Sequence, residues 1–455
     1  MINKIKQKIK PGSFLRHVLT VASGTVIAQA ITVFVSPIIT RMYTPSDMGV
    51  LASFTAIVAI FGVIAAGRYE LAIVLPETDK VSNAVFFAGL IFALVFGLVI
   101  TVGTIVFNKP LVSLLKLQGD AASWSYLLGF FVFLTGTELL LNRLAIRNRH
   151  FKVIASTQVT QQISGNGIKI GWGYFSPGTF GLFIATLFST LSRIVRLAMD
   201  EIKKLIVREN RPSWTDIKQS AIRYKKFPMV SCWEGLLNAA SVQLPVILFT
   251  MLFSPAIAGY YSLSHRILSM PMSLIGSSVA NVFLERAAKT KDDDAELGRI
   301  TLELYKKLLL IGSLIMSFVT FYGDKLLPFV FGGQWVEAGR FAQLISLTLV
   351  FQFAISPIST IFTIKEDLVG AFIWQLFLFL SRISIILFFF FGLKSVMKIL
   401  MLYTIISCIF YILFAFKIFA MAKIGLKKPL KAIIKYSCSI YIIQFLITYL
   451  LKRIF

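Results

Sequence analysis

The residues of this chain that could do chemistry are charged side chains inside long apolar segments. A charge at the centre of a bilayer costs about 3 kcal/mol on insertion scales, so such a residue is a candidate functional site by default. Arg266 is the strongest case, because it lies about ten residues, or about 15 Å, into an apolar segment expected to enter from the outer side. We predict that it contacts a substrate, and the alternative is a structural salt bridge to a neighbouring helix.

Other polar side chains in the apolar segments are weaker candidates for substrate binding. Lys169 and Arg382 lie nearer the outer side, and Arg382, set among Phe and Ile, could instead snorkel or form a pair. Arg68 lies at the inner end of its segment, where an interfacial position is expected. Together with Arg266, the predicted substrate-binding residues are Lys169, Arg68, Gln29, Asn238 and Gln243.

Two acidic residues are candidates for ion coupling. Glu138 and Glu234 each lie one to two turns from the cytoplasmic end of an expected helix. Either could pair with Arg143 or Arg68, or could bind and release a proton or another ion during transport. The sequence leaves both interpretations open.

Motifs of enzymes and of metal sites are absent from the sequence. It contains no GxxxxGK[ST], GxSxG or HExxH pattern, and its three histidines and three cysteines are scattered. We therefore predict no catalytic residue, no metal ligand and no cofactor.

The elements that carry the candidate residues are predicted to be membrane-spanning helices. Only 15% of the 455 residues are charged, whereas soluble domains carry about a quarter. Apolar runs of this length cross a bilayer as helices, because a helix satisfies its backbone hydrogen bonds internally. The predicted fold is therefore an all-α integral membrane protein, with spans at residues 16–40, 49–75, 82–107, 122–145, 151–175, 178–200, 228–252, 256–284, 302–322, 338–363, 367–392, 396–416 and 432–451.

The basic residues predict the orientation. A net charge of +25 would suggest nucleic acid in a soluble protein, but in a membrane protein Lys and Arg gather in cytoplasmic segments. Most of them fall on one side when the N-terminus is placed in the cytoplasm. We predict a multi-pass protein of the cytoplasmic membrane with no nucleic-acid partner, whose basic start, Met1–Lys10, is a retained cytoplasmic cap.

A basic loop and a weak internal repeat predict the domain organisation. Residues 1–200 form an N-terminal six-helix bundle, 201–227 a basic cytoplasmic loop, 228–416 a C-terminal six-helix bundle, and 417–455 an extension with a possible thirteenth helix. Thr44-Pro45-x-x-x-Gly49 recurs 210 residues later as Ser254-Pro255-x-x-x-Gly259. Both copies open equivalent helices, which predicts a parallel repeat. The motif itself is explained by helix capping and by proline in the first turn.

The fifth predicted span is unusually polar. We expect this helix to line a cavity or to be enclosed by other helices, because so much polarity is unfavourable against lipid. Its polar residues are Ser156, Thr157, Gln158, Thr160, Gln161, Gln162, Ser164, Asn166 and Lys169.

Several segments resemble O-antigen and capsule polysaccharide flippases of the Wzx type. They are residues 40–49, 67–76, 261–276 and 331–335, and the resemblance extends over most of the chain to about residue 420. It implies two MATE-like six-helix bundles around a central cavity, a transporter rather than an enzyme, and flipping of undecaprenyl-pyrophosphate-linked oligosaccharide to the outer leaflet. It implies that cavity Arg and Lys residues hold the anionic head group, which maps most naturally onto Arg266. The implied partners are the lipid-linked oligosaccharide, membrane lipids and a polysaccharide polymerase.

Three alternatives stay open. A cation-coupled multidrug exporter of the same fold should carry acidic residues in its first span, and residues 13–40 contain none. A membrane-embedded polymerase or ligase would typically need a large extracytoplasmic loop, whereas the largest polar loops here are predicted to be cytoplasmic. A peptidoglycan-precursor flippase is the nearest alternative, because fold-level analogy alone does not separate it from a polysaccharide flippase.

Overall fold

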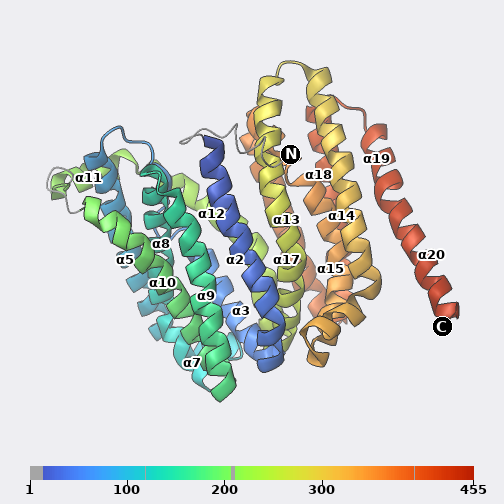
Figure 1. Ribbon diagram of the computed structural model, residues 1–455, viewed down its shortest axis with the longest axis horizontal. Coiled ribbons are helices and arrows are strands. Elements are labelled where there is room, and N and C mark those ends of the chain that lie inside the picture. Colours follow the sequence, from blue (N-terminus) through green and yellow to red (C-terminus); the bar gives the residue numbers. More distant parts are fainter. Residues whose placement is uncertain (1–13, 118, 206–210, 394, 455) are drawn as a thin grey trace. The chain divides into compact units, whose positions relative to one another are not determined.

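The computed structural model describes residues 14–117, 119–205, 211–393 and 395–454. Every regular element in these ranges is a helix (Figure 1). The predicted cytoplasmic cap, Met1–Lys10, lies outside the described residues.

The chain divides into two compact units. The N-terminal unit comprises Met1–Gln243 and Ser254–Ala256, and the C-terminal unit comprises Leu244–Phe253 and Ile257–Phe455. The helix α12 (Cys232–Leu252) is therefore shared between the units, whereas the sequence-based division assigns it wholly to the second bundle.

Long helices form most of the N-terminal unit. They are α2 (Phe14–Met42), α3 (Pro45–Gly62), α5 (Asp79–Val106), α8 (Leu128–Arg147), α9 (Phe151–Phe175) and α10 (Thr179–Leu205), with the short helices α4 (Tyr69–Ala72), α6 (Asn108–Leu114), α7 (Asp120–Trp124) and α11 (Trp214–Arg223). One part of its core joins Ile73, Phe86, Leu140 and Leu197, from α5, α8, α10 and the turn after α4.

The C-terminal unit is built in the same way. Its helices are α13 (Pro255–Lys289), α14 (Asp294–Phe331), α15 (Val336–Ile355), α16 (Ile361–Ile364), α17 (Leu368–Leu393), α18 (Val396–Met421), α19 (Lys427–Ile433) and α20 (Ser439–Ile454). Within it α14 and α15 pack against each other, and α15 and α17 both pack against α18.

The helices confirm the predicted all-α membrane fold. Among the described residues, 11 helices are long and apolar enough to cross a membrane. The two remaining predicted spans, the fifth and the eighth, coincide with α9 and α13. The segment Lys427–Tyr449 is one of the 11, so the extra C-terminal hydrophobic segment is a helix of spanning length.

Several predicted boundaries are wrong. The second span was expected over 49–75, but α3 ends at Gly62 and the chain turns through Gly67 and Arg68, whose φ angles of 59° and 57° are left-handed and cannot continue a helix. The tenth span, expected over 338–363, ends with α15 at Ile355. The expected loop 201–227 contains the end of α10 and the whole of α11.

The helix α11 is fixed to the N-terminal bundle by defined contacts. Ser213 caps it in a capping box with Asp216, and Lys80 on α5 lies 2.8 Å from the Asp216 carboxylate. The hydrogen bond from Lys80 lowers the pKa of Asp216 to about 2, so this carboxylate is ionised at neutral pH. In addition, the Tyr69 hydroxyl donates a 3.2 Å hydrogen bond to the carbonyl of Ala221. Residues 213–223 therefore pack against the N-terminal bundle.

Both units contain a close helix crossing built on glycine. A Cβ at Gly129 on α8 would lie 2.2 Å from the carbonyl oxygen of Gly97 on α5, and a Cβ at Gly339 on α15 would lie 2.3 Å from that of Gly323 on α14. Gly129 and Gly339 are 210 residues apart, the same offset as Thr44 and Ser254. This contact adds a second pair of equivalent positions to the weak internal repeat.

We expect Gly129→Ala and Gly339→Ala each to destabilise the protein by about 1–3 kcal/mol, because the added methyl meets backbone that moves only if the helices separate. The measurement is the thermal unfolding of the purified variants in detergent. Gly103→Ala on α5 is the matched control, since no atom lies within 4 Å of a Cβ there. Equal stability of all three variants would show that the crossings are not close.

Candidate functional site

Arg266 lies well inside α13. It follows Pro255, the first residue of the helix, by about eleven residues, or about 17 Å along the helix axis. Its side chain is exposed in the structure, and it makes no ion pair or side-chain hydrogen bond with any described residue. The alternative of a structural salt bridge therefore finds no partner within residues 14–454 as described, and the contact with an anionic substrate remains a prediction.

Arg382, about half-way along α17, is in the opposite situation. Its side chain is only 8% exposed, and Nη2 donates a 3.1 Å hydrogen bond to the hydroxyl of Tyr411. Its Cζ lies 5.6 Å from the ring centre of Tyr403 and 5.7 Å from that of Tyr411, both on α18. Cation–π contacts of this kind hold a desolvated guanidinium without a carboxylate. Arg382 therefore pairs inside the bundle rather than snorkelling.

One helix contacts the buried arginine and carries the exposed one. Tyr261 on α13 is buried near Arg382 and Tyr403, and the ring of His265 stacks on Tyr261 with centroids 5.9 Å apart. These two residues are one turn apart and share a face of α13. Arg266 is about 100° further round the helix, where its side chain is exposed. The C-terminal unit therefore carries one buried arginine, Arg382, and one exposed arginine, Arg266.

In the N-terminal unit, Glu138 is paired. Its carboxylate on α8 lies 2.8 Å from Nη1 of Arg193 on α10, and both side chains are largely buried at 18% and 16% exposure. Arg193 also donates a 3.2 Å hydrogen bond to the amide oxygen of Gln161 on α9. The sequence offered Arg143 or Arg68 as the partner of Glu138, and the structure shows Arg193 instead. Glu138, Arg193 and Gln161 therefore connect the three helices α8, α10 and α9.

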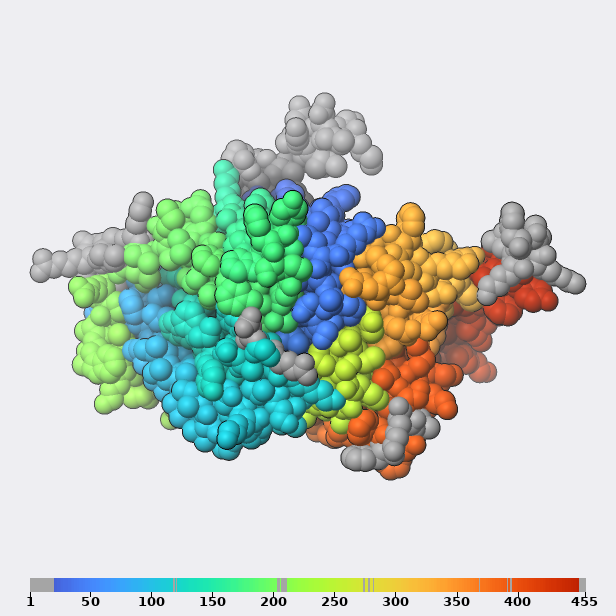
Figure 2. Space-filling view, turned by 90° about the horizontal axis from the view of Figure 1, so that it is seen from below, coloured from blue at the N-terminus to red at the C-terminus, as the bar shows by residue number. Residues whose placement is uncertain are grey.

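Much of the polarity of α9 is used in helix packing. Thr25 and Thr32 on α2 donate to the amide oxygens of Gln158 and Gln162 at 2.8 and 2.9 Å, and α9 also packs along α10. Figure 2 shows the residues of α9 and α10, in green, beside those of α2, in blue. The fifth span is thus enclosed on two sides, and its exposed polar side chains include Ser156 and Thr160.

Arg68 stands at the break after α3, in a left-handed conformation. Its guanidinium lies 3.6 Å from the carboxylate of Glu70, which is almost fully buried. A Cβ at Gly235 on α12 would come within 3.1 Å of its Cζ. Arg68 therefore has a nearby counter-charge, Glu70, and packs closely against α12, whereas Arg266 has no ion pair with a described residue.

The other candidates of the N-terminal unit lie on three different helices. Glu234 and Asn238 are exposed on α12, one turn apart, and Gln243 follows on the same helix, half-buried. Lys169 is half-buried on α9, where its carbonyl accepts a 2.7 Å hydrogen bond from the Tyr43 hydroxyl. Gln29, on α2, has a buried side-chain oxygen.

Only part of the candidate set is brought together within one unit. Glu234 and Asn238 share an exposed face of α12, and Gln29 is on the helix that packs along the α9 of Lys169. Arg266 belongs to the C-terminal unit, and the other substrate and ion-coupling candidates belong to the N-terminal unit.

Some polar contacts were missed from the sequence. Arg193 was not proposed as a partner of Glu138, although Ser189, Ser192 and Arg193 fall at the spacing of one helix face, which was a usable signal. Glu201, further along α10, is fully buried and bonded to His150 and Asn148. The contacts of Arg382 were harder to predict, because their only sign in the sequence is that Tyr403 and Tyr411 lie two turns apart on one helix.

The Glu138–Arg193 pair gives a prediction for stability. Glu138→Gln leaves a largely buried guanidinium without its counter-charge, so we expect a loss of about 2–3 kcal/mol, somewhat less than for a fully buried pair. The double variant Glu138→Gln with Arg193→Met should recover most of that loss in thermal unfolding. If the double variant is no more stable than Glu138→Gln alone, the pair does not hold these helices.

Comparison with known proteins identifies the family. The model of the family "Polysaccharide biosynthesis protein" matches residues 38–340, about two thirds of the chain. A curated relative, the succinoglycan biosynthesis transport protein ExoT of Rhizobium meliloti (strain 1021), is 22% identical over 331 residues, 72% of this chain and 63% of the relative. The chain thus spans less than two thirds of that relative.

Solved structures share the fold at low identity. The lipid II flippase MurJ in an inward closed conformation matches with a TM-score of 0.72 at 15% identity, over 96% of this chain and 97% of that one. An inward-facing multidrug resistance MATE family transporter of the MOP superfamily matches with a TM-score of 0.62 at 16% identity, over 89% and 96%. With its helical fold and its match over residues 38–340, this chain belongs to the polysaccharide biosynthesis protein family.

Proposed function

We propose that this chain moves an undecaprenyl-pyrophosphate-linked oligosaccharide from the cytoplasmic to the outer leaflet of the cytoplasmic membrane. The step would serve the synthesis of a surface polysaccharide, such as O-antigen or capsule, and would proceed by alternating access. The observation that carries the proposal is Arg266, an exposed arginine well inside the 35-residue helix α13 with no ion-pair partner among the described residues.

The chemistry of the substrate explains why an arginine would be needed. A pyrophosphate that enters a membrane protein loses water, and a planar guanidinium replaces part of that hydration with two parallel charge-assisted hydrogen bonds. The polyprenyl tail can stay in the hydrocarbon throughout, so only the pyrophosphate and the sugars need a polar path. An arginine without an internal ion pair is also suited to bind and release a substrate, because the pyrophosphate does not have to displace a carboxylate from it.

The comparisons support the same class of substrate. The family is named for polysaccharide biosynthesis, and the relative ExoT is named as a transport protein of succinoglycan biosynthesis. MurJ, which shares the fold, is named as a lipid II flippase. We extend these activities to the present chain as part of the proposal.

Ion coupling is assigned to Glu234 rather than Glu138 in this proposal. Glu234 is exposed and has no ion pair with a described residue, so it is free to bind a cation. Glu138 has its charge balanced by Arg193. A variant Glu234→Gln that transports independently of an imposed ion gradient would support this assignment.

The experiment that tests the proposed function is depletion of the protein in its host. Lipid-linked oligosaccharide should accumulate with its sugars on the cytoplasmic side, and the surface polysaccharide should disappear. Restoration by the wild-type gene is the control. Accumulation of a peptidoglycan precursor, or a change in drug sensitivity with normal polysaccharide, would instead support one of the two related transport functions.

A further inference from the structure

The helix α14 is longer than a membrane crossing requires. The helix has 38 residues, or about 57 Å, whereas the hydrocarbon core is about 30 Å thick. Its charged residues are concentrated in the first third, Asp294–Lys307, and residues 308–323 contain none. With the predicted orientation, this first third stands at the cytoplasmic surface.

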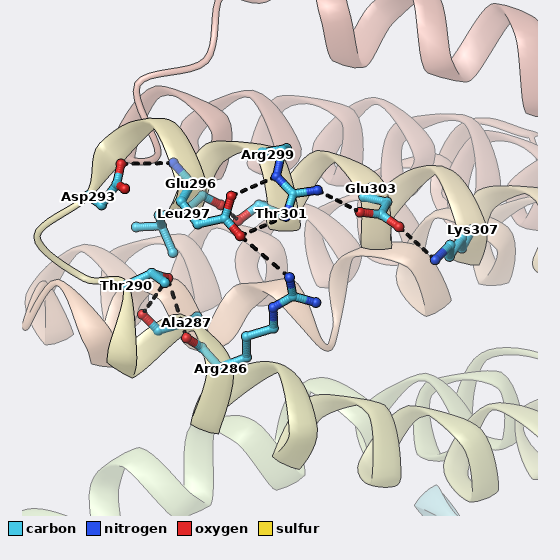
Figure 3. Close-up of polar contacts among 10 residues, drawn as sticks. All are labelled: Arg286, Ala287, Thr290, Asp293, Glu296, Leu297, Arg299, Thr301, Glu303 and Lys307. Carbon is cyan, nitrogen blue, oxygen red and sulfur yellow. Dashed lines mark hydrogen bonds and ion pairs between the residues drawn. The ribbon is translucent and has the colours of Figure 1, made fainter.

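Acidic and basic side chains alternate along this part of α14. Figure 3 shows Glu296 between Arg286 and Arg299, at 3.4 and 2.6 Å, and Glu303 between Arg299 and Lys307, at 3.4 and 2.8 Å. Each carboxylate in the series is therefore shared by two basic groups. The series therefore leaves neither of its carboxylates without a basic partner.

A cavity of about 460 Å³ lies beside this series in the C-terminal unit. It is bounded by the start of α14 and by the segment from Lys423 to Lys428, and its charged wall residues are Asp294, Arg299, Glu303, Lys306, Lys423 and Lys428. Both carboxylates are already neutralised. Asp294 lies 3.1 Å from Lys365 and 2.5 Å from Lys423, and Glu303 lies in the series above. Lys306 and Lys428 make no ion pair with a described residue, so the cavity carries two uncompensated ammonium groups.

The helix α19 beside the cavity has the pattern of a membrane-surface helix. Lys427, Lys428 and Lys431 alternate with leucines 426 and 430, which are 51% and 47% exposed. Exposed apolar side chains interleaved with lysines are typical of helices at the boundary between headgroups and acyl chains. Leu310 and Leu314, one and two turns beyond Lys306 on the same face of α14, are also exposed. Apolar surface therefore continues along α14 from the wall residue Lys306.

We propose that this cavity binds the phosphate headgroup of an anionic glycerophospholipid of the cytoplasmic leaflet. Lys306 and Lys428 hold the phosphate, and the acyl chains lie along the exposed leucines of α14. A phospholipid fits better than a free phosphate, because a dissolved ion makes no use of the bordering leucines. The site is independent of Arg266 and of the transported substrate.

The test is lipid retention by the purified protein. Wild-type protein is reconstituted in vesicles of equal phosphatidylglycerol and phosphatidylcholine, and the bound lipids are counted by native mass spectrometry. We expect preferential retention of phosphatidylglycerol, and about a 25-fold loss of that preference in Lys306→Gln with Lys428→Gln, since each lysine near an anionic surface contributes about a factor of five. Lys325→Gln with Lys398→Gln is the matched control, because it removes two exposed lysines from the opposite ends of α14 and α18.

Four outcomes decide the proposal. Loss of preference in the first double variant alone supports it. An equal loss of preference in both double variants would mean that only the general surface charge matters, and it overturns the proposal. Full retention of the preference in Lys306→Gln with Lys428→Gln also overturns it. Complete displacement of phosphatidylglycerol by inorganic pyrophosphate, or by undecaprenyl pyrophosphate at equal amount, assigns the cavity to another phosphate compound. Because no transport is measured, failure of the proposed function leaves this result unaffected.

Discussion

Arg266→Ala is expected to abolish glycan export, by at least about 100-fold, while the protein accumulates in the membrane at the wild-type level. Two charge-assisted hydrogen bonds to a pyrophosphate contribute about 1.5–3 kcal/mol each, and no described residue loses a partner when the side chain is removed. Arg266→Lys keeps the charge but loses the planar fork, so it should retain part of the export. The measurement is surface polysaccharide per unit of membrane protein in cells that depend on this chain.

The control for this variant is Arg340→Ala. Arg340 is an exposed arginine at the start of α15, 2.5 Å from the carboxylate of Glu337, and its loss removes the same charge far along the chain from Arg266. Export should then stay normal. Wild-type export by Arg266→Ala at equal abundance would remove Arg266 from the mechanism, and failure to accumulate would show that it has a structural role.

Arg382→Ala should give the reverse result, with stability lost before transport is tested. Its replacement leaves a cavity between α17 and α18 and removes the cation–π contacts with Tyr403 and Tyr411. Truncating a large buried side chain to Ala costs about 2–5 kcal/mol. Thermal unfolding in detergent should show this loss for Arg382→Ala and a change of less than about 0.5 kcal/mol for Arg266→Ala, as is usual for an exposed position.

Arg382→Met separates the volume of the side chain from its charge. Methionine fills most of the space and no carboxylate is left unpaired, so the loss of stability should be smaller than with Ala. If Arg382→Ala instead kept wild-type stability and lost export, Arg382 would belong to the transport path.

The long helices could be predicted from the sequence because an apolar run of spanning length has few alternatives. The interruption after α3 could not, since Arg68 adopts a left-handed conformation that sequence patterns rarely indicate. The end of α10 was placed at residue 200, whereas the helix continues to Leu205. The charged residues from 201 onward suggested a loop, but Glu201 is buried and bonded to His150 and Asn148 from another part of the chain.

The candidate site shows the same division between local and long-range information. Arg266 and Arg382 look alike in sequence, each an arginine among apolar residues. Only the packing of α18 against α17 distinguishes them, because it brings Tyr403 and Tyr411 to Arg382 from residues far along the chain. The polarity of α9 was visible in the sequence, but its bonds to Thr25 and Thr32 depend on how α2 packs.

The most direct test of the central claim uses the purified protein in liposomes that carry undecaprenyl-pyrophosphate-linked oligosaccharide on the inner leaflet only. The measured quantity is the fraction of sugar that becomes accessible to a membrane-impermeant glycosidase outside. We predict that wild-type protein exposes the sugar, Arg340→Ala matches it, and Arg266→Ala stays at the level of protein-free liposomes. The account would be contradicted if Arg266→Ala exposed the sugar at the wild-type rate. It would also be contradicted if correctly inserted wild-type protein exposed no sugar.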